Sequence, residues 1–287
     1  MALPVILRFK LIFPLVMLFM PAIVLALPTQ DRIDKDISQG RPVVIHVSVA
    51  LADNKHQWIV PVPEAIGNGQ EPKNNLYWGA RYGLKTFLLK DAGWVKVKSI
   101  KLENSNILER MILTKNIQRK GQSVQAYLIA DAWDGEYITD TIKHFLDMNA
   151  GHHAIKVNVA KNRDIYAGGQ AHLKVYIGHN ALMDYFGAKD KLVSTPDIAS
   201  GQLHSDAIVL ACKSKPYFAE RLNNVGVNPV VLTTGLMAPE AYTLEAAITS
   251  WIKGEDNIDI RKAAATAYAK YQKINKRPAN ILFDVGP

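Results

Sequence analysis

The sequence predicts an α/β protein with a mostly parallel sheet that helices cover on both faces. Short apolar runs rich in β-branched residues recur along the chain, and such runs are typical of strands buried on both sides of a sheet. Amphipathic helical segments alternate with these runs, as they do where helices connect parallel strands. The chain contains no internal repeat, low-complexity segment or linker, so residues 42–287 are expected to form a single domain.

The first 26 residues have the layout of a secretory signal peptide. The first ten carry two basic side chains and no acidic one, residues 11–24 are apolar, and Val24, Leu25 and Ala26 fit a cleavage site. The apolar run is short for a membrane span and contains two prolines, although an uncleaved anchor is the alternative. We expect an exported, periplasmic or extracellular protein that is free of the membrane once residues 1–26 are removed. The polar residues 27–41 are expected to form a flexible leader.

The first half of the domain is expected to supply five strands and two helices. Apolar and β-branched stretches predict strands at 42–52, 94–102, 107–113, 124–130 and 155–160, with the second and third as a hairpin. Apolar residues three and four apart predict helices at 76–89, behind an asparagine cap, and at 136–148. Three prolines and two glycines predict a loop over 57–72.

The second half of the domain repeats the alternation of strand and helix. Compact apolar runs predict strands at 173–179, 207–212 and 230–234. Helical spacing predicts helices at 180–187, 216–224, 239–252 and 258–274. Pro239 in a first turn and Gly254 beyond a last turn delimit the third of these helices.

Composition and motifs argue against several kinds of partner. The net charge is +8, but the basic residues are scattered and do not alternate with aromatic ones, so no nucleic-acid surface is expected. The sequence lacks Gly-x-Ser-x-Gly, a phosphate-binding loop, His-Glu-x-x-His and Cys-x-x-Cys, and it therefore predicts no cofactor and no metal site. Side chains of the adjacent His152 and His153 would diverge on a strand, so we expect them to be exposed rather than metal-bound.

Cys212 is the only cysteine, so the chain has no internal disulfide. A lone thiol in an oxidising compartment is a liability unless it is buried or used. Cys212 ends an apolar strand and is followed by Lys213, Lys215 and a helix start, a setting suited to a reactive thiolate. His179 ends the other strand of this kind, 33 positions earlier, which leaves room for one crossover between neighbouring parallel strands. Because open α/β sheets bind ligands at the carboxyl ends of their strands, we predict that His179 and Cys212 meet there.

This pattern resembles the caspase-like cysteine peptidases of clan CD, such as caspases, legumains, clostripain and gingipains. Those proteins have a hydrophobic block ending in His beside Gly, and a later block ending in Ala-Cys, which Gly178-His179 and Ala211-Cys212 match within residues 173–234. The resemblance implies a three-layer α/β/α sandwich, a catalytic His179–Cys212 dyad, and a peptide or protein substrate. In the family, Gly follows the His and its N–H binds the oxyanion, whereas Asn180 stands there in this chain. Asn tolerates positive φ, so the N–H groups of Asn180 and Cys212 are the expected oxyanion donors.

Asp131 and Asp134 follow the strand predicted at 124–130. Such acids could receive a basic substrate side chain, or they could cap the helix predicted at 136–148. The departure at Asn180 also leaves room for a degenerate relative that does not cleave. The alternative function is a non-catalytic envelope protein that binds a ligand or partner at the same strand ends, with Cys212 buried.

Overall fold

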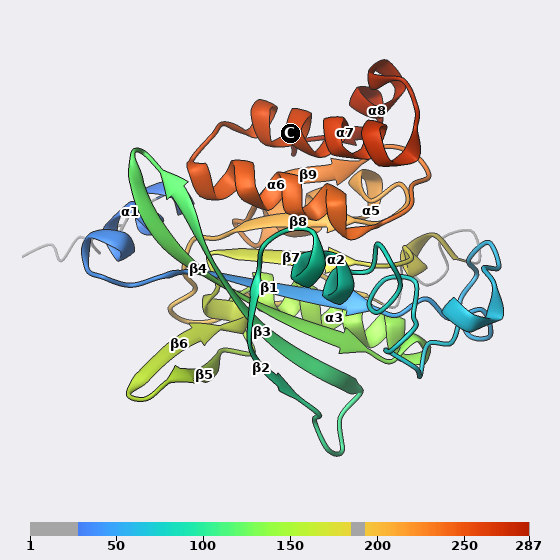
Figure 1. The fold of residues 1–287 in the computed structure, drawn as a ribbon, viewed down its shortest axis with the longest axis horizontal. Helices are drawn as coiled ribbons and strands as arrows, with labels where there is room; N and C mark the ends of the chain where they lie inside the picture. Colours follow the sequence, from blue (N-terminus) through green and yellow to red (C-terminus); the bar gives the residue numbers. More distant parts are fainter. Residues whose placement is uncertain (1–27, 185–192, 287) are drawn as a thin grey trace, which may run out of the picture.

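The structure is a computed structural model that describes residues 28–184 and 193–286. The predicted signal peptide at 1–26 and the end of the helix predicted at 180–187 lie outside these residues. The described chain forms a central sheet with helices on both faces (Figure 1). The predicted three-layer α/β/α architecture is therefore confirmed.

The central sheet has eight strands in the order β10-β9-β8-β7-β1-β4-β3-β2. Strands β9, β8, β7, β1 and β4 are parallel, whereas β10, β3 and β2 are antiparallel to their neighbours. The bounds are β1 Val43–Ala50, β2 Val95–Ile100, β3 Ile107–Arg119, β4 Gln122–Trp133, β7 Leu173–Ile177, β8 Asp206–Leu210, β9 Asn228–Thr233 and β10 Phe283–Asp284. A separate hairpin comprises β5 Ile155–Ala160 and β6 Arg163–Ala167.

The α-helices of the described residues are α1 Thr29–Ser38, α2 Leu84–Lys90, α3 Ile138–Asn149, α5 Lys215–Asn224, α6 Ala241–Lys253, α7 Asn257–Gln272 and α8 Lys276–Leu282. Short 3₁₀ turns are η1 Glu64–Ile66, η2 Gly135–Tyr137, η3 Gly168–Gln170 and η4 Ala181–Met183. Helices α1, α2, α6 and α7 pack on one face of the sheet, and α3 and α5 pack on the other. The β5–β6 hairpin covers the remaining part of that second face.

Strand β7 shows why the apolar runs predicted doubly buried strands. Its residues alternate between the two cores: Leu173, Val175 and Ile177 face the α6–α7 layer, and Tyr176 faces the α3–α5 layer. Burying an aliphatic side chain of this size contributes about 1.5–3 kcal/mol, so each face independently favours the strand. The exception is Lys174, which is fully buried and donates from Nζ to Ser205 Oγ (2.7 Å).

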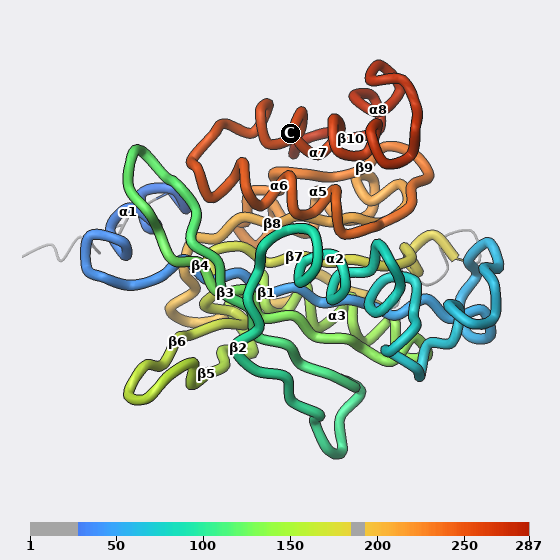
Figure 2. The backbone as a smooth tube through the Cα atoms, in the orientation of Figure 1, coloured from blue at the N-terminus to red at the C-terminus, as the bar shows by residue number. Residues whose placement is uncertain are grey.

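Residues 29–38, within the leader predicted to be flexible, form helix α1 and pack against the sheet. Ile33 is fully buried, and Arg119 at the end of β3 donates from Nε to Asp34 Oδ1 (2.8 Å). Figure 2 shows the tip of the β3–β4 hairpin beside α1. Arg119 and Asp34 are 85 positions apart, so the local sequence of a polar leader could not predict this contact.

The helix predicted at 76–89 is shorter than expected and begins only at Leu84. Glycines explain the difference, because a Cβ at Gly79 would collide with the Lys73 carbonyl and one at Gly83 with the Trp78 backbone. The predicted asparagine cap has another role: Asn75 accepts the Ala52 N–H (3.1 Å) and donates to the Ala52 carbonyl (2.8 Å). It fixes this loop to the end of β1. The sequence also gave no prediction of β6, α8 or β10.

Candidate functional site

The carboxyl ends of β7 and β8 bring His179 and Cys212 to the same edge of the sheet. In the parallel pairing, Ile177 lies opposite Leu210, and the two candidate residues each follow two positions later. Neighbouring strands lie about 4.8 Å apart, so the loops that follow β7 and β8 begin next to each other. The pairing extends past the strand, because Gly178 N–H donates to the Leu210 carbonyl (3.2 Å).

Asn180 joins the two loops directly. Its Nδ2 donates to the Cys212 carbonyl (2.8 Å), and its Oδ1 accepts the Leu182 N–H (3.2 Å). The side chain is fully buried, so these bonds form away from water, where leaving them unmade would be costly. Asn180 therefore holds the segment after His179 against the segment that carries the thiol.

His179 is oriented by a carboxylate. Its Nε2 lies 2.6 Å from Asp184 Oδ1, and both side chains are buried. An ionised carboxylate only accepts hydrogen bonds, so the proton of the neutral ring is on Nε2, which leaves Nδ1 with a lone pair. Tyr176 Oη donates to the His179 carbonyl (2.7 Å) and fixes the backbone of the same residue.

Cys212 is partly exposed, unlike the strand residues before it. Its Sγ lies 3.3 Å from the Met237 N–H and 3.4 Å from the Met237 carbonyl, both in the loop after β9. Lys213 has a left-handed backbone (φ +46°) and donates its N–H to the Gly235 carbonyl (2.8 Å). This turn places Cys212 between the end of β8 and the start of α5.

Two phenols lie near the thiol. Burial raises the pKa of Tyr77, and the neighbouring charges of Cys212 and Glu240 raise it further. The pKa of Tyr268 is raised by burial in the same way, with Cys212 and Glu240 again contributing, although the hydrogen bond from Ala238 N–H (3.2 Å) opposes the shift. Both rings are therefore neutral at neutral pH.

The backbone geometry before His179 requires a glycine. Gly178 adopts φ +154°, and a Cβ there would lie 3.0 Å from both the Cβ and the carbonyl oxygen of Ala50 at the end of β1. Asn180 has an ordinary φ of −89°, so the positive φ that the sequence suggested for it is not present. The unusual backbone of this loop comes before the histidine rather than after it.

Asp131 does not face a substrate. It is fully buried, and its two oxygens accept from Arg110 Nε (2.6 Å), Arg110 Nη2 (2.7 Å) and His46 Nε2 (3.0 Å). Burial alone would raise the pKa of Asp131, but the hydrogen bonds and charges of Arg110 and His46 outweigh it and lower the pKa. Because its acceptor sites are taken inside the protein, the expected substrate-binding role of Asp131 is replaced by an internal ion pair.

Asp134 has the capping role that the sequence left open. Its Oδ1 accepts the N–H of Glu136 (3.0 Å) at the start of η2, which leads into α3. The same oxygen accepts from Gln70 Nε2 (2.6 Å). Asp134 is partly exposed just beyond the end of β4, so its contact with a substrate stays a prediction.

Asp184 is the site residue that the sequence reasoning missed. It lies five positions after His179, in the segment predicted as a short helix, and nothing in the local pattern distinguishes it from a surface acid. The nearest usable signal was the presence of a carboxylate within one loop of the candidate histidine. Among residues 28–184 and 193–286, no group of three or more His, Cys, Asp or Glu side chains is arranged to hold a metal ion.

Comparison with models of known protein families and with curated proteins gave no match. No helix in the described part of the chain has the length and apolar character needed to cross a bilayer. The case for a function therefore rests on the geometry of the site.

Proposed function

We propose that this protein is an exported cysteine hydrolase that cleaves peptides, with Cys212 as nucleophile and His179 as general acid and base. The observation that carries the proposal is the register of β7 and β8, which brings the two residues to matching positions beyond adjacent strand ends. The Asn180 bond to the Cys212 carbonyl adds support, because it keeps the two loops together beyond the sheet. The same arrangement of a histidine and a cysteine at strand ends supports the resemblance to the caspase-like peptidases.

The proposed reaction has two steps. The Cys212 thiolate attacks the carbonyl carbon of the scissile amide, and the C–N bond breaks as protonated His179 gives its proton to the leaving amine. Water then attacks the thioester while His179 takes a proton from it. The C–S bond breaks, the carboxylic product leaves, and the thiolate is restored.

Two further groups have positioning roles in this proposal. Asp184 holds Nε2 of His179, so Nδ1 is the nitrogen left to exchange protons with the substrate. The backbone N–H groups of Cys212 and Asn180 would bind the oxyanion, by analogy with the family. Leu236, 66% exposed beside the Met237 contact to the thiol, offers an apolar surface to the substrate chain.

One observation favours the alternative of a non-catalytic binding protein. The thiol of Cys212 is within hydrogen-bonding distance of both the N–H and the carbonyl of Met237, as in a cysteine that only fastens two loops together. The two functions differ in the chemistry of the sulfur. A structural thiol reacts when the protein unfolds, whereas a catalytic one reacts in the folded protein.

The test is alkylation of the folded, exported protein with iodoacetamide at mildly acidic pH, followed by mass spectrometry. We expect fast modification of Cys212 and loss of that rate in His179→Ala, but not in the control His153→Asn, whose histidine is exposed. Hydrolysis of a fluorogenic peptide set should be lost together with alkylation. A thiol that reacts only in denaturant would overturn the proposal and leave the binding function.

A further inference from the structure

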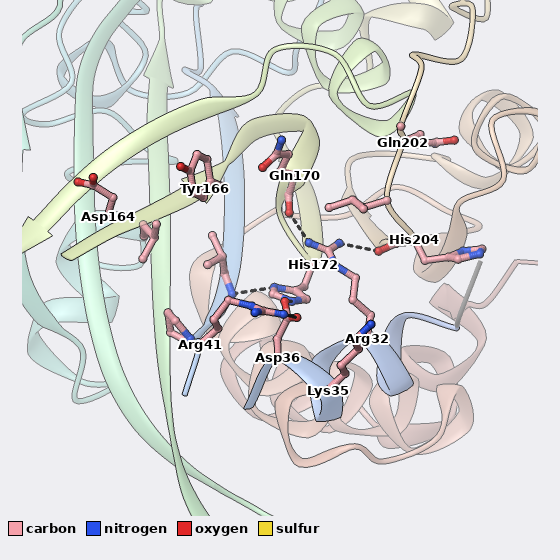
Figure 3. A pocket seen from close by; sticks show the side chains of 15 residues that line it. Arg32, Lys35, Asp36, Arg41, Asp164, Tyr166, Gln170, His172, Gln202 and His204 are labelled. Atoms are coloured by element: carbon pink, nitrogen blue, oxygen red, sulfur yellow. Dashed lines mark hydrogen bonds and ion pairs between the residues drawn. The ribbon is translucent and has the colours of Figure 1, made fainter. Parts of the chain in front are cut away.

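A cavity lies at the opposite edge of the sheet, by the amino ends of β1 and β7. It has a volume of about 640 Å³ and is bounded by α1, β6 and the segment 201–204 (Figure 3). Six residues from Asp206 to Cys212 separate the two edges along β8, which corresponds to about 20 Å. This cavity is therefore separate from the His179–Cys212 site, and the inference drawn from it does not rest on the proposed peptidase function.

The charged wall of this cavity has more cations than free anions. Asp36 accepts from His172 Nε2 (2.9 Å) on one oxygen and from Arg41 on the other, so its charge is already matched. Arg32 and Lys35 extend from the same helix, α1, and among the described residues neither has a carboxylate within 4.0 Å. Neither cation is thus part of a salt bridge, although Asp36 is near enough to raise the pKa of Arg32.

Arg32 is the more constrained of these two cations. Its Nη1 donates to the carbonyls of His204 (2.7 Å) and Ala171 (3.4 Å), and its Nη2 donates to that of Gln170 (2.6 Å), as the dashed lines in Figure 3 partly show. A guanidinium has five N–H donors, so two are left over. Burial lowers the pKa of Arg32 to about 10, and this effect is larger than the opposing effect of nearby Asp36.

The other wall of the cavity is largely apolar and includes one acid, Asp164 of β6, whose Oδ2 is paired with Lys156 Nζ (2.8 Å). Val44 and Ile165 are buried at its base, while Tyr166 of β6 is 53% exposed and Leu203 is 40% exposed at its rim. Figure 3 shows Tyr166 across the cavity from the α1 side chains. His172 adds no positive charge at neutral pH, because burial lowers its pKa to about 4 although Asp36 opposes the shift. The cavity thus pairs one cationic wall with one largely apolar wall.

We propose that this cavity binds a small organic carboxylate whose body is an apolar ring or chain. The carboxylate would meet Lys35 and the spare donors of Arg32, and the apolar body would lie against Tyr166 and Leu203. A guanidinium favours the two oxygens of a carboxylate because its donors form a matching fork. The volume is in the range of about 300–1,000 Å³ that small-molecule sites occupy.

The test is a fluorine NMR titration of the whole protein with para-fluorobenzoate and with its uncharged match, para-fluorobenzyl alcohol. We expect the carboxylate to bind with a Kd in the low millimolar range or better, and the alcohol at least about fivefold more weakly. Lys35→Glu should weaken binding of the carboxylate about tenfold with little effect on the alcohol, whereas Lys98→Glu, a matched change on β2, should not. Tyr166→Ala should weaken both probes, and Tyr137→Ala, a matched exposed tyrosine, neither.

Three results would overturn the proposal. The first is that neither probe binds, and the second is that both bind equally. The third is that Lys35→Glu and Lys98→Glu change the affinity for the carboxylate by the same factor, which would indicate general charge attraction. Lys35 and Tyr166 are exposed, so these variants are expected to fold, and circular dichroism verifies it. If Lys35→Glu still hydrolyses peptides, the cavity and the His179–Cys212 site function independently.

Discussion

The two edges of the central sheet differ in the hydrogen bonds that their polar side chains make. At the carboxyl edge, His179 and Cys212 are carried by loops, where Asp184 contacts the imidazole and Met237 contacts the thiol. At the amino edge, Arg32 and His172 are tied to several backbone groups and to Asp36. The cavity of about 640 Å³ is at the amino edge, whereas the histidine and cysteine of the proposed reaction are at the carboxyl edge. A cavity thus indicates binding, whereas the register of strand ends indicates which side chains can react together.

The largest expected effect concerns the nucleophile at the carboxyl edge. Cys212→Ala should lower kcat/KM for peptide hydrolysis by about 10⁴-fold or more, because no other thiol exists to form the acyl-enzyme. Thermal unfolding should change little. Lys120→Gln, at the tip of the β3–β4 hairpin, is the control and should retain full activity. Activity that survives in Cys212→Ala would exclude this thiol from the reaction.

At the amino edge, a buried cation should matter for stability rather than for activity. Arg119 is 1% exposed and joins α1 to α6 through Asp34, Gln30 Oε1 and the Ile252 carbonyl. Arg119→Ala should lower the free energy of unfolding by about 2–4 kcal/mol in urea titrations, since it leaves buried acceptors unpaired. Arg81→Ala breaks an exposed pair with Asp91 and should have little effect on the free energy of unfolding. Equal losses of unfolding free energy in the two variants would show that the buried Arg119 side chain does not stabilise the amino edge.

A third variant tests whether Asp184 positions His179 at the carboxyl edge. Asp184→Asn should lower kcat about 10²-fold, because an amide can donate to Nε2 and favour the wrong tautomer of His179. The pH–rate profile should shift as well, whereas a purely structural role would leave it in place. Asp197→Asn, in the loop before β8, serves as the control. An unchanged profile in Asp184→Asn would remove Asp184 from the site.

The smallest expected effect is a pH dependence that originates at the amino edge. His172 has a folded pKa of about 4 because of burial, against an ordinary value of 6.5, so the unfolded chain binds more protons between these values. Stability from this group is therefore present above pH 6.5 and is lost as the pH falls toward 4. His144, with a pKa lowered to about 3 by burial and by the neighbouring charge of His153, acts in the same direction.

Chemical denaturation across this window should show a loss of about 1–3 kcal/mol, reduced in His172→Asn and unchanged in the control His204→Asn. A slope that His172→Asn leaves intact would assign the effect to His144 or to other groups. His172→Asn should leave peptide hydrolysis over the same pH range unchanged, because the proposed reaction takes place at the other edge of the sheet.

The parallel strands and most helices were predictable from the sequence, and the register of β7 and β8 agrees with the expectation that His179 and Cys212 follow neighbouring strand ends. Doubly buried strands need apolar side chains on both faces, and that requirement is visible along a single stretch of chain such as 173–177. The capping role of Asp134 could also be predicted from the sequence, because its partner lies two positions away. In each of these cases the deciding interaction is local, or it follows from the direction of neighbouring strands.

The roles of α1, Asp131 and Asp184 depend on contacts between segments that are distant in the sequence or lie in loops. The Asp131 carboxylate is matched by Arg110 and His46, which are 21 and 85 positions away, and α1 depends on Arg119. Gly178 is required by the approach of Ala50 from another strand. Such contacts are set by how distant segments pack, so a pattern of neighbouring residues cannot specify them. The cavity beneath α1 has the same origin, because its walls come from segments that meet only in the folded chain.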